Sequence, residues 1–93
     1  LKLPSVATEM QCYTGKTGTT YRGIVQTTKS GKTCQRWDSQ KPHQHIRIYK
    51  DYPNKGLIEN YCRNPGDGEA PWCYTMDPDV RWEYCSILSS SFT

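Results

Sequence analysis

Five cysteines are the residues whose chemistry most constrains this chain. They stand at positions 12, 34, 62, 73 and 85 of a 93-residue sequence, which has only 13 Leu, Ile, Val and Phe residues but seven Tyr and three Trp. A chain of this size forms one domain with a marginal core, and disulfides stabilise small extracellular domains whose aliphatic core is this small. The composition therefore predicts one secreted, disulfide-bonded domain. Because five is an odd number, one sulfur lacks a partner within the chain.

The remaining reactive side chains do not form the pattern of a catalytic or metal site. The cysteines lack the pairs spaced by two residues that are typical of zinc ribbons, and the only histidines, His43 and His45, lie one residue apart in a loop beside Pro42. No nucleophile beside a general base and no carboxylate pair with an acid can be identified. We therefore expect a non-catalytic domain without a metal or a cofactor.

Positive charge is concentrated in the first half of the chain. Residues 12–55 contain nine Lys and Arg against two Asp, a net charge of +7, whereas residues 56–93 carry a net charge of −4. Such a basic half either solvates a small surface or attracts polyanions such as heparan sulfate. No nucleic-acid partner is expected. No apolar run approaches the roughly 18 residues of a membrane-spanning helix, and we expect that any signal peptide has been removed.

Short strands joined by turns must position these side chains, because no stretch of ten residues keeps the 3.6-residue apolar period of a helix. Three segments have the composition of strands: residues 46–49, 72–76 and 81–85. The turn between the last two indicates an antiparallel pair. Alternation places Trp72 and Tyr74 on one face of its first strand. It places Trp82 and Tyr84 on one face of its second strand.

Six short motifs occur in order along the chain: Tyr-Arg-Gly at residues 21–23, Cys-Gln-Arg-Trp at 34–37, Pro-His-Gln-His at 42–45, Asn-Tyr-Cys-Arg-Asn-Pro at 60–65, Pro-Trp-Cys-Tyr-Thr at 71–75 and Arg-Trp-Glu-Tyr-Cys at 81–85. Together they resemble a kringle domain of the plasminogen and apolipoprotein(a) type, and kringles like those of hepatocyte growth factor share nearly the same motifs. The resemblance implies a small disulfide-rich kringle fold, mostly loops with short antiparallel β-strands and little or no helix. It implies three parts of the chain: a linker at residues 1–11, the kringle domain at 12–90 and a tail at 91–93.

The resemblance also implies how the cysteines pair. Kringles join their first cysteine to the sixth, the second to the fourth and the third to the fifth. The implied inner bridges are Cys34 to Cys73 and Cys62 to Cys85. Cys12 would be the first cysteine, but Ser90 stands where its partner is expected. We therefore expect Cys12 to be unpaired within the chain, as a free thiol, a capped adduct or an intermolecular disulfide.

Many kringles of this type bind a lysine in a trough, and the resemblance implies which residues would form it here. Trp72, Tyr74 and Trp82 occupy the aromatic positions that contact the methylene chain of the ligand. Arg47 and Arg81 occupy the positions of the cations that receive its carboxylate, a role that suits the guanidinium fork. In the same comparison, Trp37 and His43 are expected to have structural roles.

The anionic part of the trough is not retained. Lysine-binding kringles have two acidic residues, separated by one position, directly after Arg-Asn-Pro, whereas this chain has Gly66, Asp67 and Gly68. In an extended segment Asp67 would point away from the ligand, although the flanking glycines would let Asp67 or Glu69 swing toward it. We therefore expect weak or no lysine binding, and a site of cations and aromatic rings that favours carboxylates, sulfates or acidic side chains.

The functional hypothesis is a non-catalytic, protein-binding kringle of a secreted multidomain protein, whose parent chain could be a serine-protease zymogen or a protease-like protein. Its partners would be proteins, recognised through lysine or acidic side chains. The alternative is a growth-factor-type kringle that binds heparan sulfate or a receptor through its basic first half. A third possibility is a spacer that has lost ligand binding.

Overall fold

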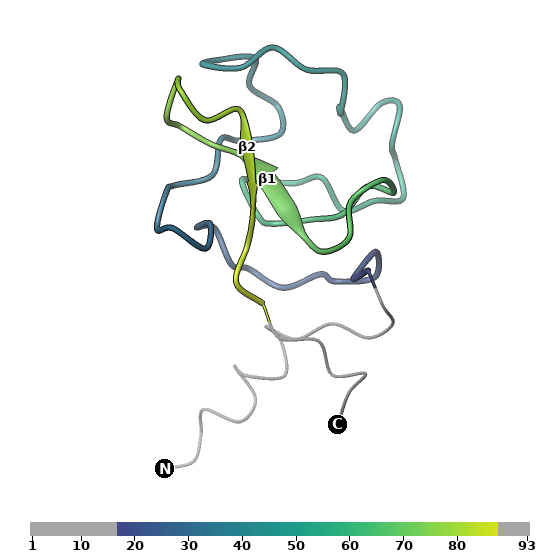
Figure 1. The fold of residues 1–93 in the computed structure, drawn as a ribbon. Coiled ribbons are helices and arrows are strands. Elements are labelled where there is room, and N and C mark those ends of the chain that lie inside the picture. The colour runs from purple at the N-terminus through teal and green to yellow at the C-terminus, as the bar shows by residue number, and fades with distance from the viewer. Residues whose placement is uncertain (1–16, 88–93) are drawn as a thin grey trace.

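Two short strands form the only regular sheet among the residues that the structure describes. The structure is a computed structural model that describes residues 17–87, and its strands are β1 (Trp72–Tyr74) and β2 (Trp82–Tyr84). The remaining described residues form turns and irregular loops, which lie on both sides of the strand pair (Figure 1). No helix in this part of the chain is long and apolar enough to cross a bilayer. The expected fold class is therefore confirmed.

The strands pair as an antiparallel hairpin, as the sequence predicts. Trp72 lies opposite Tyr84, and Tyr74 lies opposite Trp82. Cross-strand partners share one face of a sheet, so all four rings lie on the same side. The turn between the strands is closed by a hydrogen bond from the amide of Val80 to the carbonyl of Asp77, at 3.0 Å.

The strand expected at residues 46–49 is absent from the structure, and that prediction was wrong. This segment is irregular and runs into a turn, in which the amides of Asp51 and Tyr52 both donate to the carbonyl of Ile48. The amide of Arg47 donates instead to the ring of His45. Because these local hydrogen bonds use the backbone groups, no neighbouring strand pairs with the segment.

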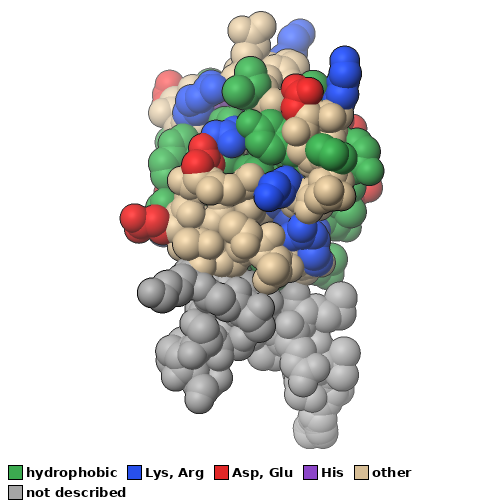
Figure 2. All heavy atoms as spheres, turned by 90° about the vertical axis from the view of Figure 1, so that its right-hand side faces the viewer, with side chains coloured by type: hydrophobic (Ala, Val, Ile, Leu, Met, Phe, Trp, Pro, Cys, Tyr) green, Lys and Arg blue, Asp and Glu red, His purple; other side chains and the backbone are tan. Residues whose placement is uncertain are grey.

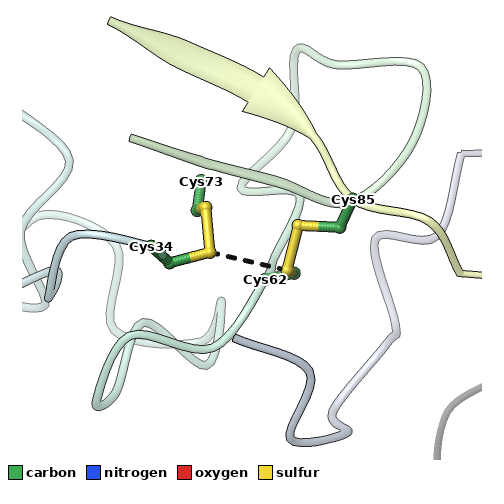
Figure 3. A group of neighbouring side chains, drawn as sticks. All are labelled: Cys34, Cys62, Cys73 and Cys85. Carbon is green, nitrogen blue, oxygen red and sulfur yellow. Dashed lines mark hydrogen bonds between the residues drawn. A yellow bond between two sulfur atoms is a disulfide. The ribbon is translucent and has the colours of Figure 1, made fainter. Parts of the chain in front are cut away.

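The two inner disulfides lie side by side in the centre of the domain (Figure 3). They join the cysteines that the resemblance pairs: Cys34 with Cys73 and Cys62 with Cys85. The Sγ atoms of Cys34 and Cys62 are 3.7 Å apart, and all four sulfurs lie within 4.8 Å of one another. Every sulfur is bonded to another and carries no hydrogen, so the dashed contact in Figure 3 is a van der Waals contact. Bonded sulfurs are also not the thiolates that bind zinc. Cys12 and Ser90 lie outside the described residues.

Aromatic rings surround the disulfides and form most of the core. Tyr21 and Trp37 are each 1% exposed, and Leu57 is the only Leu, Ile or Val residue in the buried core of the described chain. The indole N–H of Trp37 donates to the carbonyl of Tyr61 at 2.7 Å. Its ring contacts Trp72 edge-on, with centroids 5.4 Å apart. Trp37 therefore has the structural role expected from the sequence.

A buried arginine joins three loops of the core. Arg63 is 1% exposed, and its guanidinium donates to the carbonyls of Gly56, Gly23 and Cys62 at 2.7 to 2.8 Å. The ring of Tyr61 lies 5.2 Å from the guanidinium carbon. Burial lowers the pKa of Arg63 to about 10, so the side chain is still charged at neutral pH. Carbonyl dipoles and aromatic faces therefore replace the water that this cation loses.

Replacing this buried cation should destabilise the fold strongly. Arg63→Met keeps much of the side-chain volume but removes the donor to the carbonyls of Gly23 and Cys62, and a buried unsatisfied group costs about 1–3 kcal/mol. We expect the free energy of unfolding to fall by about 3 kcal/mol or more, measured by urea denaturation with the disulfides intact. Arg36→Met is the control, because Arg36 is an exposed surface cation and its loss should have a much smaller effect. Equal losses in the two variants would contradict this role of Arg63.

Candidate functional site

A trough opens beside the aromatic face of the hairpin. It has a volume of about 840 Å³. Its lining includes all six residues that the sequence assigns to a ligand site: Arg47, Asp67, Trp72, Tyr74, Arg81 and Trp82. The fold therefore brings together residues that are up to 35 positions apart in the chain.

The floor of the trough is also part of the core. Trp72 and Tyr74 are 6% and 7% exposed, and their ring centroids lie 5.1 Å apart in an edge-to-face contact. The ring centroids of Trp82 and Trp72 lie 5.9 Å apart. Trp82 nevertheless remains 47% exposed, so its ring forms a wall of the trough that faces solvent. Rigid rings of this kind, with Trp82 about half exposed, offer apolar surface to an alkyl chain at little cost in side-chain entropy.

The two trough arginines lie over neighbouring rings of the floor. The guanidinium carbon of Arg47 is 5.9 Å from the centre of the Trp72 ring, and that of Arg81 is 5.2 Å from the Tyr74 ring. These distances allow cation–π attraction, which holds both charges above the floor. Arg81 is exposed, and no carboxylate in residues 17–87 forms an ion pair with it.

Asp67 does not point away from the trough but forms an ion pair with Arg47. The Oδ2 atom of Asp67 accepts a hydrogen bond from Nη2 of Arg47, whose side chain is 19% exposed. Burial alone would lower the pKa of Arg47, but the hydrogen bond and the attraction to Asp67 raise it above its ordinary value. Among residues 17–87, Asp67 is the one acidic residue that lines the trough. Its carboxylate is therefore already engaged by a cation of the protein itself.

The loop that carries Asp67 depends on the two glycines beside it. The buried side chain of Asn64 holds this loop: its Oδ1 accepts from the amides of Gly66 and Gly68, and its Nδ2 donates to the carbonyl of Gly68. Gly66 has a φ of +138°, which strongly favours glycine. A Cβ atom at position 68 would lie 2.8 Å from Cδ1 of Trp72. Acidic side chains at positions 66 and 68 would therefore require the loop or the indole to move.

His45 also lines the trough, where the charges of both arginines act on it. Its ring stacks on Tyr74 with centroids 4.6 Å apart. Its Nδ1 accepts from the amide of Arg47 at 3.1 Å, so the ring proton is on Nε2, which donates to the carbonyl of Ser39 at 2.9 Å. Burial lowers the pKa of His45 below its ordinary value, and the charges of Arg81 and Arg47 act in the same direction, whereas the bond to Ser39 opposes them.

Comparison with known proteins identifies the family. A family model of the kringle domain matches residues 12–90. The chain belongs to the kringle family. It is also similar to the human "Putative apolipoprotein(a)-like protein 2", with 54% identity over 88 residues, which is 95% of this chain and 64% of that protein. The chain thus spans a little under two thirds of the length of this relative.

Membership of the kringle family supports a binding role for the domain. Kringles are generally non-catalytic, protein-binding modules of extracellular proteins. The aromatic floor and both cations line the trough, whereas the single carboxylate that residues 17–87 place there is paired with Arg47. The chemistry that this trough offers is therefore a cation beside an apolar surface, rather than an anion.

Sequence reasoning missed two residues that shape the trough of this kringle. Asn64 stands in the quoted Arg-Asn-Pro motif, and a short amide before Pro65 and Gly66 is a known signal for a side chain that caps a turn. The sequence comparison predicts a structural role for His43 and assigns no role to His45. That interpretation holds for His43, which is 8% exposed and contacts the carbonyl of Asp77 at 3.0 Å. No sequence signal separates the two histidines, because their exposure depends on how the loop folds.

The lowered pKa of His45 should make this kringle less stable as the pH falls. The unfolded chain binds a proton at residue 45 at a higher pH than the folded chain, so the free energy of unfolding should decrease below about pH 6.5. The His45→Gln variant, which keeps polar groups but does not titrate, should have a shallower decrease between about pH 7.5 and 5.5. Urea denaturation at several pH values measures both slopes. Parallel slopes, or a wild type that gains stability on acidification, would refute the assignment.

Proposed function

We propose that this kringle is a protein-binding module of a secreted multidomain protein and that its trough binds lysine weakly or not at all. The observation that carries the proposal is the ion pair between Asp67 and Arg47. A lysine ligand needs carboxylates for its ammonium group, and the only carboxylate that the described residues contribute to the trough lining is engaged by Arg47. The binding function of the family and the intact aromatic floor support a protein ligand of another kind.

The missing anions have a large effect on affinity for an amine. A hydrogen bond to a charged group contributes about 1.5–3 kcal/mol, and each 1.4 kcal/mol is about a tenfold change in affinity. Binding of a lysine would also have to displace Arg47 from Asp67, because the two groups compete for one carboxylate. The trough should therefore bind an amine ligand at least about ten times more weakly than a trough with a free acidic pair.

The isolated domain should not bind lysine analogues. We expect 6-aminohexanoate to give no saturable heat in calorimetry at micromolar concentrations, and we expect the domain to pass through lysine-agarose without retention. The indole N–H signals of a nuclear magnetic resonance spectrum would show that the same sample is folded. Micromolar affinity for 6-aminohexanoate would overturn the proposal.

Binding of heparan sulfate is the second candidate, and the pairing of charges in the fold argues against it. Three cations of the basic first half form ion pairs with acids of the second half: Lys32 with Asp77, Arg36 with Glu59 and Arg47 with Asp67. On the face shown in Figure 2, basic side chains are interspersed with acidic and hydrophobic ones. Within the described residues, three cations of the basic half are thus balanced by acids, and the face in Figure 2 does not gather the basic side chains into one patch.

A heparin column tests this second candidate directly. Since the cations are interspersed with acids, we expect elution from heparin at an ionic strength below the physiological value of about 0.15 M. If the trough does not bind heparin, the charge of Arg81 contributes little to retention. The Arg81→Gln variant should therefore elute at nearly the same salt concentration as the wild type. Retention well above physiological salt would favour the glycan-binding alternative.

Cys12 offers a further, covalent route to a partner. The other four cysteines of the sequence are bonded to one another. Cys12, which lies outside the described residues, therefore has no cysteine left within the chain. A free thiol, a capped adduct and an intermolecular disulfide remain the three predicted states, which the intact mass of the unreduced protein distinguishes.

A further inference from the structure

The ion pair between Arg47 and Asp67 makes the two cations of the trough chemically different. The charge of Arg47 is balanced by Asp67. Arg81 is exposed, lies over the ring of Tyr74 and has no acidic partner among residues 17–87. Both guanidinium groups lie over neighbouring rings of one floor, because Trp72 lies beneath Arg47 and its ring is 5.1 Å from that of Tyr74.

We propose that the trough binds a single carboxylate joined to an apolar chain, with no amine required. The proposal rests on the proposed function, since it concerns the same trough, and it names the ligand class. Arg81 receives the carboxylate through its guanidinium fork. The apolar chain lies along Trp72 and against the exposed ring of Trp82.

The apolar surface of the trough is large enough to matter for such a ligand. Trp82 is 47% exposed and Ile46, which also lines the trough, is 71% exposed. Covering these side chains with methylene groups removes apolar surface of both partners from water, which is the main source of affinity for a small ligand with one charge. A carboxylate without an apolar chain would contact only an exposed cation, and such contacts contribute little.

The position of Arg47 makes the binding of an amine in the trough unfavourable. In a lysine-binding trough the ammonium group of the ligand meets carboxylates, but here the guanidinium of Arg47 already occupies Asp67. An ammonium group beside Asp67 would meet the like charge of Arg47 and lose water without a partner. The internal ion pair thus acts as a fixed substitute for the amine of the ligand. A polyanionic glycan fits less well, because within residues 17–87 the trough offers one cation without an ion pair above an apolar floor.

Three six-carbon ligands that differ only in their charged ends test the proposal by calorimetry on the whole chain. We expect millimolar binding of hexanoate, binding of 6-aminohexanoate that is at least about tenfold weaker, and no binding of hexylamine. The Arg81→Gln substitution should weaken the binding of hexanoate by about tenfold or more. Lys50→Gln is the matched control: it removes one exposed charge outside the trough lining and should leave the affinity unchanged.

The Asp67→Asn variant gives a test with the opposite sign. Freeing Arg47 adds a second available cation above the floor, so hexanoate should bind about fivefold more tightly or better. The same variant should not gain affinity for hexylamine. Unchanged or weaker hexanoate binding in a folded Asp67→Asn protein would overturn the proposal, since a purely structural ion pair predicts no gain.

The outcomes separate this proposal from the proposed function. If neither hexanoate nor 6-aminohexanoate binds, the loss of lysine binding stands and the carboxylate proposal fails. If 6-aminohexanoate binds more tightly than hexanoate, the carboxylate proposal fails, and the proposed function fails with it when that affinity is micromolar. A heparin tetrasaccharide could also compete with hexanoate for the trough. If the tetrasaccharide displaces hexanoate and binds more tightly than hexanoate does, the proposal is overturned in favour of a sulfated glycan.

A protein could present this ligand either as its C-terminal carboxylate or as an acidic side chain. Both sources share the chemistry of a carboxylate beside apolar carbon. A short peptide that ends in leucine, compared with its C-terminal amide, tests the first source. An amidated peptide with glutamate beside leucine tests the second. Binding of either acid-bearing peptide with loss in the Arg81→Gln variant supports the proposal, and binding of neither contradicts it.

Discussion

The contact between the two disulfides is the constraint on which the rest of this kringle depends. Cys73 lies in β1 and Cys85 directly follows β2, whereas Cys34 and Cys62 belong to loops that are far from them in sequence. Because the four sulfurs lie within 4.8 Å of one another, both loops are fixed against the hairpin. The disulfides thereby supply stability that aliphatic side chains supply in larger domains, because Leu57 is the only buried Leu, Ile or Val among the described residues.

The trough inherits its geometry from these crosslinks. Cys62 is followed directly by Arg63, which ties three loops together, and by Asn64, which holds the loop of Asp67. The carboxylate of Asp67 therefore reaches the trough from a loop that is anchored on one disulfide. The rings of the floor project from the strand that is anchored on the other. A surface made mostly of irregular loops can be well defined only because each loop is held in this way.

Some of these features could be predicted from the sequence and others could not. Alternation and turn residues predicted the hairpin, and the family motifs implied both bridges and the residues around the trough. The irregular path of residues 46–49 was not predictable, because its backbone groups are used by local hydrogen bonds that only the folded loop forms. The pairing of Asp67 with Arg47 was missed for a related reason. Alternation describes an extended segment, whereas the φ of +138° at Gly66 turns the loop toward Arg47.

In the binding mode that we propose, the trough differs from a lysine-binding trough in its charge preference and not in its aromatic floor. A nuclear magnetic resonance titration that follows the three indole N–H signals tests this difference. We predict that hexanoate shifts the signals of Trp72 and Trp82, while the signal of the buried Trp37, whose N–H is bonded to Tyr61, stays in place. Shifts of Trp72 and Trp82 that saturate at micromolar 6-aminohexanoate, with none from hexanoate, would contradict it.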